Sequence, residues 1–181
     1  MNTYSSIRAI FTIGHSTRTL EDFIELLKLN DIRIGIDIRT IPRSRHNPQF
    51  NIETLPGSLR TEGIDYQHMK GLGGLRHPRA DSPNQGWHNA SFRGFADYMQ
   101  TNEFEENIVA LRKLAEKETI ALICAEAVPW RCHRSLIADA LAVRGARVEH
   151  ILSRTNISPH RITPWAIVNL AQLIYPPPNS D

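Results

Sequence analysis

The residues best suited to chemistry lie together in a short segment between an apolar run and the start of a predicted helix. They provide two thiols, a carboxylate, an imidazole and two guanidinium groups, from Cys124, Glu126, Arg131, Cys132, His133 and Arg134. A thiolate can act as a nucleophile, a carboxylate can transfer a proton, and guanidinium groups bind anionic oxygens. Each residue taken alone also has an ordinary explanation, because buried cysteines pack as small apolar side chains and arginines are common on surfaces. Their concentration in one loop favours a functional site.

These residue types suggest an enzyme that acts on a phosphate-bearing, nucleotide or nucleic-acid-related ligand. Cys124 would be the nucleophile or a wall of the pocket, and Glu126 would be the general acid or base. Arg131 and Arg134 would bind anionic oxygens of the ligand, together with Arg39 from an earlier loop. The apolar neighbours of Glu126 make an unpaired carboxylate costly, so Glu126 needs a partner. The alternative to a catalytic Glu126 is that Arg131 or Arg134 pairs with it and gives it a structural role. No cofactor is predicted for this enzyme.

A metal site is a second use of the same segment. Cys124, Cys132 and His133 offer three ligands, whereas a closed structural zinc site needs four, so a distant histidine would have to complete it. We expect the two cysteines to be free thiols, because a reducing cytosol disfavours a structural disulfide. We also expect the protein to fold without metal, since strands and helices supply its core.

The flanking residues predict a buried strand before this loop and a helix after it. Residues 119–123 are apolar with a β-branched bias, and the strand should end near Cys124. The helix should start within residues 131–134, bury one apolar face and stop at Gly145. A strand that leads into a helix in this way leaves free backbone N–H groups and the positive end of the helix dipole, which suit an anion.

Three earlier strands are predicted at residues 8–14, 32–38 and 64–68, and each one ends in polar residues. A helix from a capping box at Thr19 to about Asn30 separates the first two strands. The carboxyl ends of parallel strands meet at one edge of a sheet, where ligands bind. The residues expected at this edge are His15, Ser16, Asp37, Arg39, His68, Cys124 and Glu126. Of these, we expect His15, Asp37, Arg39, Cys124 and Glu126 to line one pocket, with His15 and Asp37 as further catalytic candidates.

The remaining segments complete a prediction of an α/β fold, with a three-layer, mostly parallel, Rossmann-like sheet and helices on both faces. A long irregular loop region follows the second strand over residues 40–89, and it adds Arg43, Ser44 and Tyr66 to the ligand-binding candidates. Helices are predicted at residues 91–98 and from Thr101, and a last strand at residues 147–152. A C-terminal helix should open at Thr163, and residues 176–181 should fray. The chain is interpreted as a single domain over residues 1–181.

The composition of the chain indicates its cellular location. The 181 residues are 41% hydrophobic with a mean hydropathy of −0.33, and there is no apolar run of the ~20 residues that span a bilayer. With no secretory signal at residues 1–10, we expect a cytoplasmic protein without membrane association.

Residues 39–94 hold eight Lys and Arg against four Asp and Glu, and also half of the eight histidines: His46, His68, His77 and His88. A non-catalytic module that binds nucleic acid through this basic region, with bases stacked on Phe50, Tyr66 and Trp87, is therefore an alternative function. The oligomeric state is left open.

The motifs together resemble the domain of unknown function 488 family over nearly the whole chain. They are Gly14-His-Ser, Asp37-Ile-Arg with Pro42 and Ser44, Tyr66 ahead of Leu72-Gly-Gly, Cys124-Ala-Glu and Cys132-His-Arg. The resemblance implies a compact α/β domain and supports the site, but it implies no reaction. Asp37-Ile-Arg also resembles rhodanese-like domains.

The loop after the central strand invites comparison with cysteine phosphatases, whose nucleophilic Cys opens a loop that cradles an oxyanion. Residues 125–130 make the spacing from Cys to Arg one residue longer than in that loop. Glu126 also puts a negative charge where the phosphate would rest, and a neighbouring carboxylate opposes thiolate formation. Both departures argue against the phosphatase mechanism.

Overall fold

A six-stranded sheet forms the middle of the protein in the computed structural model, which describes residues 8–177. The strands are β1 (Ile10–Gly14), β2 (Ile34–Asp37), β3 (Asp65–His68), β4 (Ile120–Cys124), β5 (Val148–Ile151) and β6 (Ile157–Pro159). Their order across the sheet is β3-β2-β4-β1-β5-β6, and only β6 pairs antiparallel to its neighbour. The predicted, mostly parallel sheet is therefore confirmed, and the antiparallel strand β6 is an addition to it.

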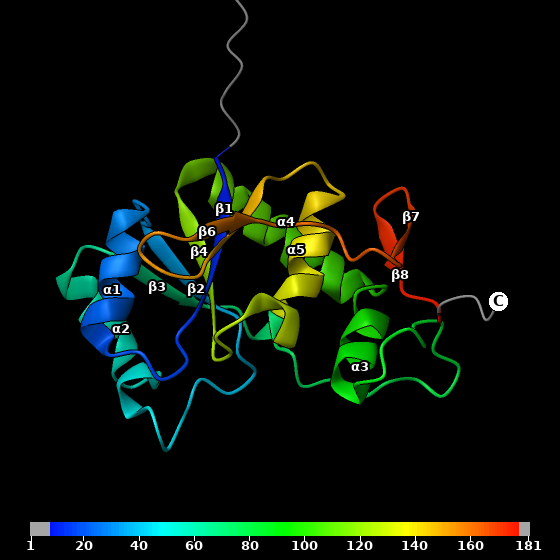
Figure 1. The fold of residues 1–181 in the computed structure, drawn as a ribbon, viewed down its shortest axis with the longest axis horizontal. Helices are drawn as coiled ribbons and strands as arrows, with labels where there is room; N and C mark the ends of the chain where they lie inside the picture. The colour runs from blue at the N-terminus through cyan, green and yellow to red at the C-terminus, as the bar shows by residue number, and fades with distance from the viewer. Residues whose placement is uncertain (1–7, 178–181) are drawn as a thin grey trace, which may run out of the picture.

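Helices cover both faces of this sheet, which confirms the three-layer architecture. On one face lie α1 (Leu20–Leu29) and α2 (Leu55–Thr61), and on the other α4 (Asn102–Lys117) and α5 (Arg134–Ala142), with α3 (Ala90–Tyr98) beside them (Figure 1). The central strand β4 is buried along its whole length, and its side chains pack into the hydrophobic cores on both faces of the sheet. Its Ala121 and Ile123 belong to the core under α1 and α2, whereas Ile120, Leu122 and Cys124 belong to the core under α4 and α5.

Local sequence signals explain where the helices begin and end. The Thr19 side chain accepts a hydrogen bond from the Asp22 N–H, and Thr101 caps α4 in the same way through the Phe104 N–H. Gly145 has φ of 82°, the left-handed conformation in which glycine ends a helix without steric cost. These predicted caps and the predicted stop after α5 are confirmed.

The loop region after β2 contains more structure than the sequence predicted. Helix α2 lies within it, together with the short 3-10 helices η1 (Pro48–Phe50) and η2 (Lys70–Leu72). Helix α2 was missed because only Leu55 and Leu59, one turn apart, mark its buried face. Its packing against the sheet stabilises a helix that such a short sequence pattern does not predict by itself.

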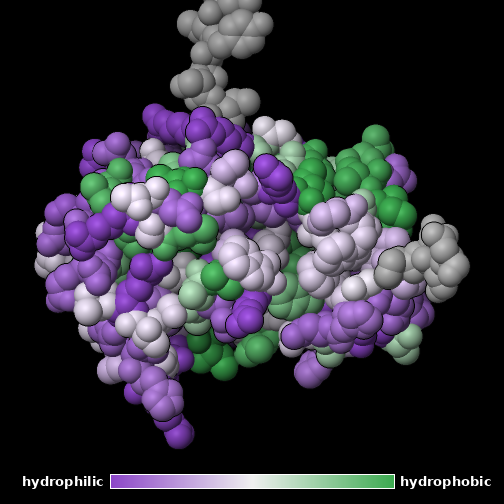
Figure 2. Space-filling model, in the orientation of Figure 1, coloured by the Kyte–Doolittle hydropathy of each residue, from purple (hydrophilic) through white to green (hydrophobic). Residues whose placement is uncertain are grey.

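The predicted C-terminal helix at Thr163 is wrong, because this segment forms the hairpin β7 (Ile167–Asn169) and β8 (Gln172–Ile174). Its β-branched residues favour strands, and Leu170 with φ of 56° begins the two-residue turn between them. The Tyr175 hydroxyl donates to Asp139 Oδ2 at 2.9 Å and so ties the hairpin to α5. Figure 2 shows an apolar surface over this hairpin, where Leu170 is 92% exposed. Of the predicted frayed tail, residues 178–181 lie outside the described range.

Across residues 8–177, no helix is both long enough and apolar enough to cross a lipid bilayer.

Candidate functional site

A cavity of about 680 Å³ opens where β1, β2 and β4 end. Many of the expected site residues line it: His15, Ser16, Arg39, Arg43, Ser44, Cys124, Glu126, Arg131, Cys132 and His133. They come together because β4 pairs with both β1 and β2, so the three strand ends are adjacent. A larger hollow of about 930 Å³ lies along α1 and α2, but none of the expected site residues lines it.

Asp37, Tyr66, His68 and Arg134 are not among the residues that line the cavity, although the sequence suggested them as site residues. Asp37 is fully buried behind Arg39 and accepts hydrogen bonds from its Nε at 2.9 Å and its Nη2 at 2.6 Å. Burial opposes a charged guanidinium, but the hydrogen bonds and charge of Asp37 outweigh it and raise the pKa of Arg39. Asp37 therefore holds a cation in the cavity wall.

Two further contacts fix the Arg39 side chain. Its Nη2 donates to the Phe50 carbonyl at 2.7 Å, and its Nη1 lies 3.2 Å from His15 Nε2. Since a guanidinium only donates, Nε2 must be the acceptor, and the His15 hydrogen is on Nδ1, which donates to the Ser16 carbonyl at 2.9 Å. Burial lowers the pKa of His15, and the charge of Arg39 acts in the same direction. His15 is therefore a neutral support for Arg39, with both ring nitrogens occupied.

Tyr66 and His68 support this arrangement from β3. The Tyr66 hydroxyl donates to Asp37 Oδ2 at 2.7 Å, and burial together with the Asp37 charge raises the pKa of Tyr66. The ring of His68 lies 2.8 Å from the Arg39 carbonyl through Nε2, so this nitrogen donates. Both residues position the cavity wall and do not reach the cavity.

The two thiols and His133 form a cluster in the wall of the cavity. Their sulfur and ring-nitrogen atoms lie within 4.8 Å of one another, and Cys132 Sγ is 3.8 Å from His133 Nδ1. A hydrogen bond from the Cys132 thiol lowers the pKa of Cys124 well below its ordinary value despite burial, and His133 and Arg134 lower it further. Burial and the neighbouring Cys124 sulfur raise the pKa of Cys132. Both cysteines are free thiols, as expected from the sequence.

Arg134 is a structural clamp and does not face the ligand cavity, contrary to the expectation from the sequence. It is 1% exposed, and its Nη1 and Nη2 donate to the carbonyls of Glu126 and Ala127 at 2.6 and 2.9 Å. The clamp holds the loop after β4 so close to β1 that a Cβ on Gly14 would lie 1.7 Å from the Glu126 carbonyl oxygen. Gly14 is therefore required for this close approach.

We expect Gly14→Ala to lower the free energy of unfolding by about 1–3 kcal/mol, because the added methyl must push the clamped loop away. Gly57→Ala is the matched control, since a Cβ there meets no atom within 4 Å and Gly57 lies inside helix α2. This control should be neutral or should stabilise the protein by up to about 1 kcal/mol. Urea unfolding of both variants tests the prediction, and equal midpoints would refute it.

Glu126 differs from the sequence expectation, because it is exposed and unpaired. Within residues 8–177 no basic side chain forms an ion pair with its carboxylate, and Arg134 binds its backbone carbonyl instead. Arg131 is also exposed, and over the same range it has no acidic partner. The alternative pairing of Glu126 with Arg131 or Arg134 is therefore wrong. Both side chains are left available to a ligand.

Arg43 and Ser44 form the outer wall from the loop after β2. Arg43 pairs with Glu53 at the surface, and the Ser44 N–H donates to Asn51 Oδ1 at 2.6 Å. Ser16 also lines the cavity and has φ of 46°, an uncommon conformation for a residue other than glycine, and its N–H donates to the Ala125 carbonyl at 2.8 Å.

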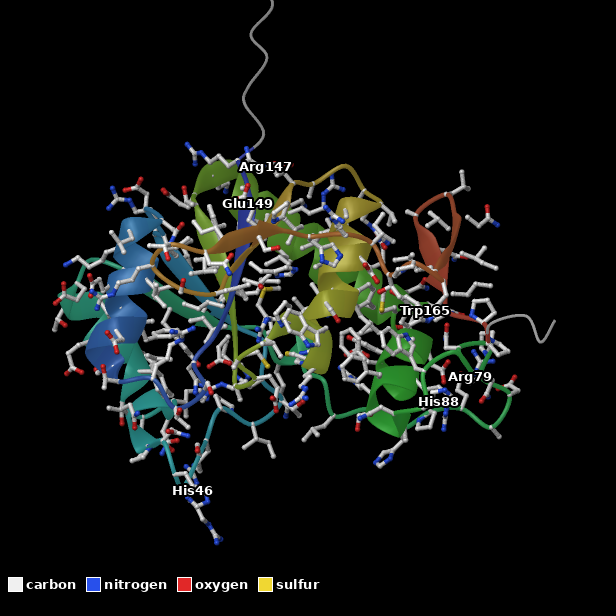
Figure 3. The ribbon with its side chains drawn as sticks, in the orientation of Figure 1. His46, Arg79, His88, Arg147, Glu149 and Trp165 are labelled. Atoms are coloured by element: carbon white, nitrogen blue, oxygen red, sulfur yellow. The ribbon has the colours of Figure 1, made fainter. Side chains whose placement is uncertain are left out.

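The basic segment 39–94 does not form one continuous surface. In Figure 3, His46 lies at the tip of a loop, whereas Arg79 and His88 lie beside α3 at the other end of the molecule. Phe50, expected to stack on a base, is fully buried and stacks on His15 with 4.3 Å between ring centroids. Trp87 packs its ring against Phe92, Trp165 and Tyr175. The expected platform of Phe50, Tyr66 and Trp87 is therefore absent from the described part of the chain.

The sequence reasoning missed the groups that hold His133 in place. Its Nε2 lies 3.1 Å from the Ile38 carbonyl and 3.0 Å from the Leu72 carbonyl. Gly74 passes so close that a Cβ there would lie 2.4 Å from His133 Nδ1. The Leu72-Gly-Gly motif was the available signal, because Gly74 permits this close approach to the His133 ring.

Comparison with known proteins identifies a family but no characterised relative. A family model described as "Domain of unknown function DUF488" matches residues 19–141. Searches of curated proteins and of solved structures found no match.

Proposed function

The chain belongs to the DUF488 family, a domain of unknown function, and we propose that it is an enzyme that acts on a phosphate-bearing ligand of nucleotide type. One observation carries this proposal. A single cavity combines guanidinium groups that can bind an anion, a free carboxylate that can transfer a proton, and the Cys124–Cys132–His133 cluster.

The charges around the cavity favour an anionic ligand. Three guanidinium groups line it, from Arg39, Arg43 and Arg131, against one carboxylate, from Glu126. Arg39 is held rigidly by Asp37, His15 and the Phe50 carbonyl, so binding a ligand would cost it little side-chain entropy. Of these three arginines, Arg131 alone has no acidic partner among residues 8–177, and phosphate oxygens are ligands that a guanidinium group binds strongly.

The size and shape of the cavity fit a small molecule. Its volume of about 680 Å³ is in the range of about 300–1,000 Å³ that is typical of small-molecule sites. The site lies outside the carboxyl ends of parallel strands, where ligands of α/β folds bind. A nucleotide-sized ligand could reach both the arginines and the cysteine cluster.

Glu126 is the residue that would make this site catalytic. Its carboxylate shares the cavity with the cysteine cluster and has no competing cation within the described residues. It would accept or donate the proton at the reacting atom of the ligand, and Arg131 would orient the anionic group. Cys124 would be the reactive sulfur or a ligand-contacting wall.

We expect Arg131→Gln to weaken the binding of nucleoside phosphates by at least about tenfold, because a hydrogen bond to a charged group contributes about 1.5–3 kcal/mol. Calorimetric titration with inorganic phosphate and with nucleoside mono- and diphosphates measures the effect. Arg60→Gln is the control, since Arg60 is exposed on α2 and does not line the cavity. If none of these phosphates binds the wild-type protein, or if both variants bind as wild type does, the proposed ligand class is wrong.

A further inference from the structure

We infer that Cys124, Cys132 and His133 bind one zinc ion in the wall of the cavity, through both sulfurs and His133 Nδ1. Metal binding by these three residues does not depend on the proposed function. Only a part for the metal in the reaction rests on that function. The site is of the open kind, with three protein ligands and a fourth position that faces the cavity.

The distances among the three donor atoms are close to those of a zinc site. All lie within 4.8 Å of one another, and Cys132 Sγ lies 3.8 Å from His133 Nδ1. Tetrahedral zinc, with Zn–S of about 2.3 Å and Zn–N of about 2.0–2.1 Å, requires about 3.8 Å between sulfurs and about 3.5 Å between sulfur and nitrogen. A shift of a few tenths of an ångström to about one ångström in these side chains is enough to admit the ion.

The surroundings of His133 select the nitrogen that would bind the metal. Both neighbours of Nε2, at 3.1 and 3.0 Å, are carbonyl oxygens, of Ile38 and Leu72, so Nε2 must carry a hydrogen. That leaves Nδ1 facing the thiols. A metal-binding histidine ordinarily donates its other N–H to a carbonyl or carboxylate in this way, which fixes the ring and its tautomer.

Zinc binding requires both sulfurs as thiolates, and Arg134 stabilises negative charge beside them. Arg134 is buried beside them, and among residues 8–177 no carboxylate pairs with its guanidinium. Its backbone N–H lies 3.4 Å from Cys132 Sγ, the short contact expected of a sulfur that accepts hydrogen bonds. Two thiolates and an imidazole are soft and borderline ligands, which select zinc over magnesium or calcium.

The open position distinguishes this site from a structural zinc site. Among the described residues, no fourth His, Cys, Asp or Glu joins the cluster, so the distant histidine considered from the sequence is not found there. The three ligands line the same cavity as Glu126 and Arg131. A water molecule or a ligand oxygen would occupy the fourth position, and the Glu126 carboxylate of the same cavity is the group that would accept its proton.

Cobalt titration of the full chain tests the inference without any assay of activity. The protein is reduced, treated with a chelator, freed of chelator and titrated with Co²⁺, which reports cysteine ligands through sulfur-to-metal charge-transfer absorption. We expect one equivalent to bind, zinc to displace it, and the chelated protein to keep a thermal unfolding transition that zinc then raises. The wild-type protein decides first, because the absence of charge-transfer absorption from the reduced protein at saturating Co²⁺ would overturn the inference.

Variants then assign the ligands. Cys124→Ser, Cys132→Ser and His133→Gln should each weaken cobalt binding by more than about 100-fold, beyond the 10–100-fold that loss of a supporting residue typically causes. His88→Gln is the matched control, because His88 is exposed and does not line the cavity, and it should bind cobalt as wild type does. Equal affinity in folded His133→Gln and wild-type protein would remove His133 from the site and overturn the three-ligand assignment.

The phosphate titrations separate this inference from the proposed function. If the chelated protein binds nucleoside phosphates and acts on them as the untreated protein does, the function stands and the metal has no part in the reaction, while the cobalt titration alone decides whether the three residues bind a metal. If cobalt binds with the expected spectrum but no phosphate compound binds, the metal site stands and the proposed ligand class fails.

Discussion

Replacing Asp37 with Asn should lower the free energy of unfolding by about 3–5 kcal/mol, because the change leaves the buried Arg39 guanidinium without its counter-charge. Asp37 is fully buried, and Arg39 is 6% exposed. Their ion pair, with 2.6 Å between Nη2 and Oδ2, is buried, so solvent compensates little for the lost carboxylate. The asparagine keeps the size of the side chain, so the loss reports charge and not a cavity. Urea unfolding measures it.

Two further variants show whether burial causes this loss. Asp81→Asn removes the same charge from the Asp81–Arg79 pair at the surface, where both side chains are more than half exposed. It should cost no more than about 1 kcal/mol. Tyr66→Phe removes one hydrogen bond from Asp37 and should cost about 1 kcal/mol. If Asp37→Asn costs no more than Asp81→Asn, the pair does not organise the cavity wall as described.

Replacing Glu126 with Gln should lower turnover by about 100-fold or more, because the amide cannot accept or donate the proton at the reacting atom. The free energy of unfolding should hardly change, since the carboxylate is exposed and has no basic partner among residues 8–177. Affinity for the phosphate compound identified by titration should also be kept. The measurement is a comparison of melting temperature, affinity and turnover between the two proteins.

Glu106→Gln is the control for this experiment. Glu106 is likewise an exposed glutamate without an ion-pair partner among residues 8–177, but it lies on α4 and does not line the cavity. Its replacement should leave turnover near the wild-type value. A folded Glu126→Gln protein with unchanged turnover would remove Glu126 from the mechanism and favour a module that binds its ligand without chemistry.

The sequence predicted the secondary structure well wherever a periodic pattern was long or a cap was explicit. Helices α1 and α4 follow from capping threonines and an apolar face, and β4 follows from an uninterrupted apolar run. Prediction failed in short segments, where residue preferences are weak. Helix α2 and the hairpin of β7 and β8 are held by contacts with the rest of the protein, such as the hydrogen bond from Tyr175 to Asp139.

The sequence by itself determined that polar side chains follow the strands and would meet at one edge of a parallel sheet, because local sequence sets the strand ends and the alternation of strands with helices favours parallel pairing. Only the tertiary structure decided what those side chains do there. Pairing of β4 between β1 and β2 brings Cys124 beside Gly14, and it turns Arg134 inward as a clamp while Glu126 stays exposed. Pairing of strands far apart in the chain, and the direction of each side chain after its strand ends, depend on contacts that no local pattern contains. The same reason applies to the cluster of Cys124, Cys132 and His133. The carbonyls of Ile38 and Leu72 hold the His133 ring with Nδ1 facing the sulfurs, and these contacts exist only in the folded protein.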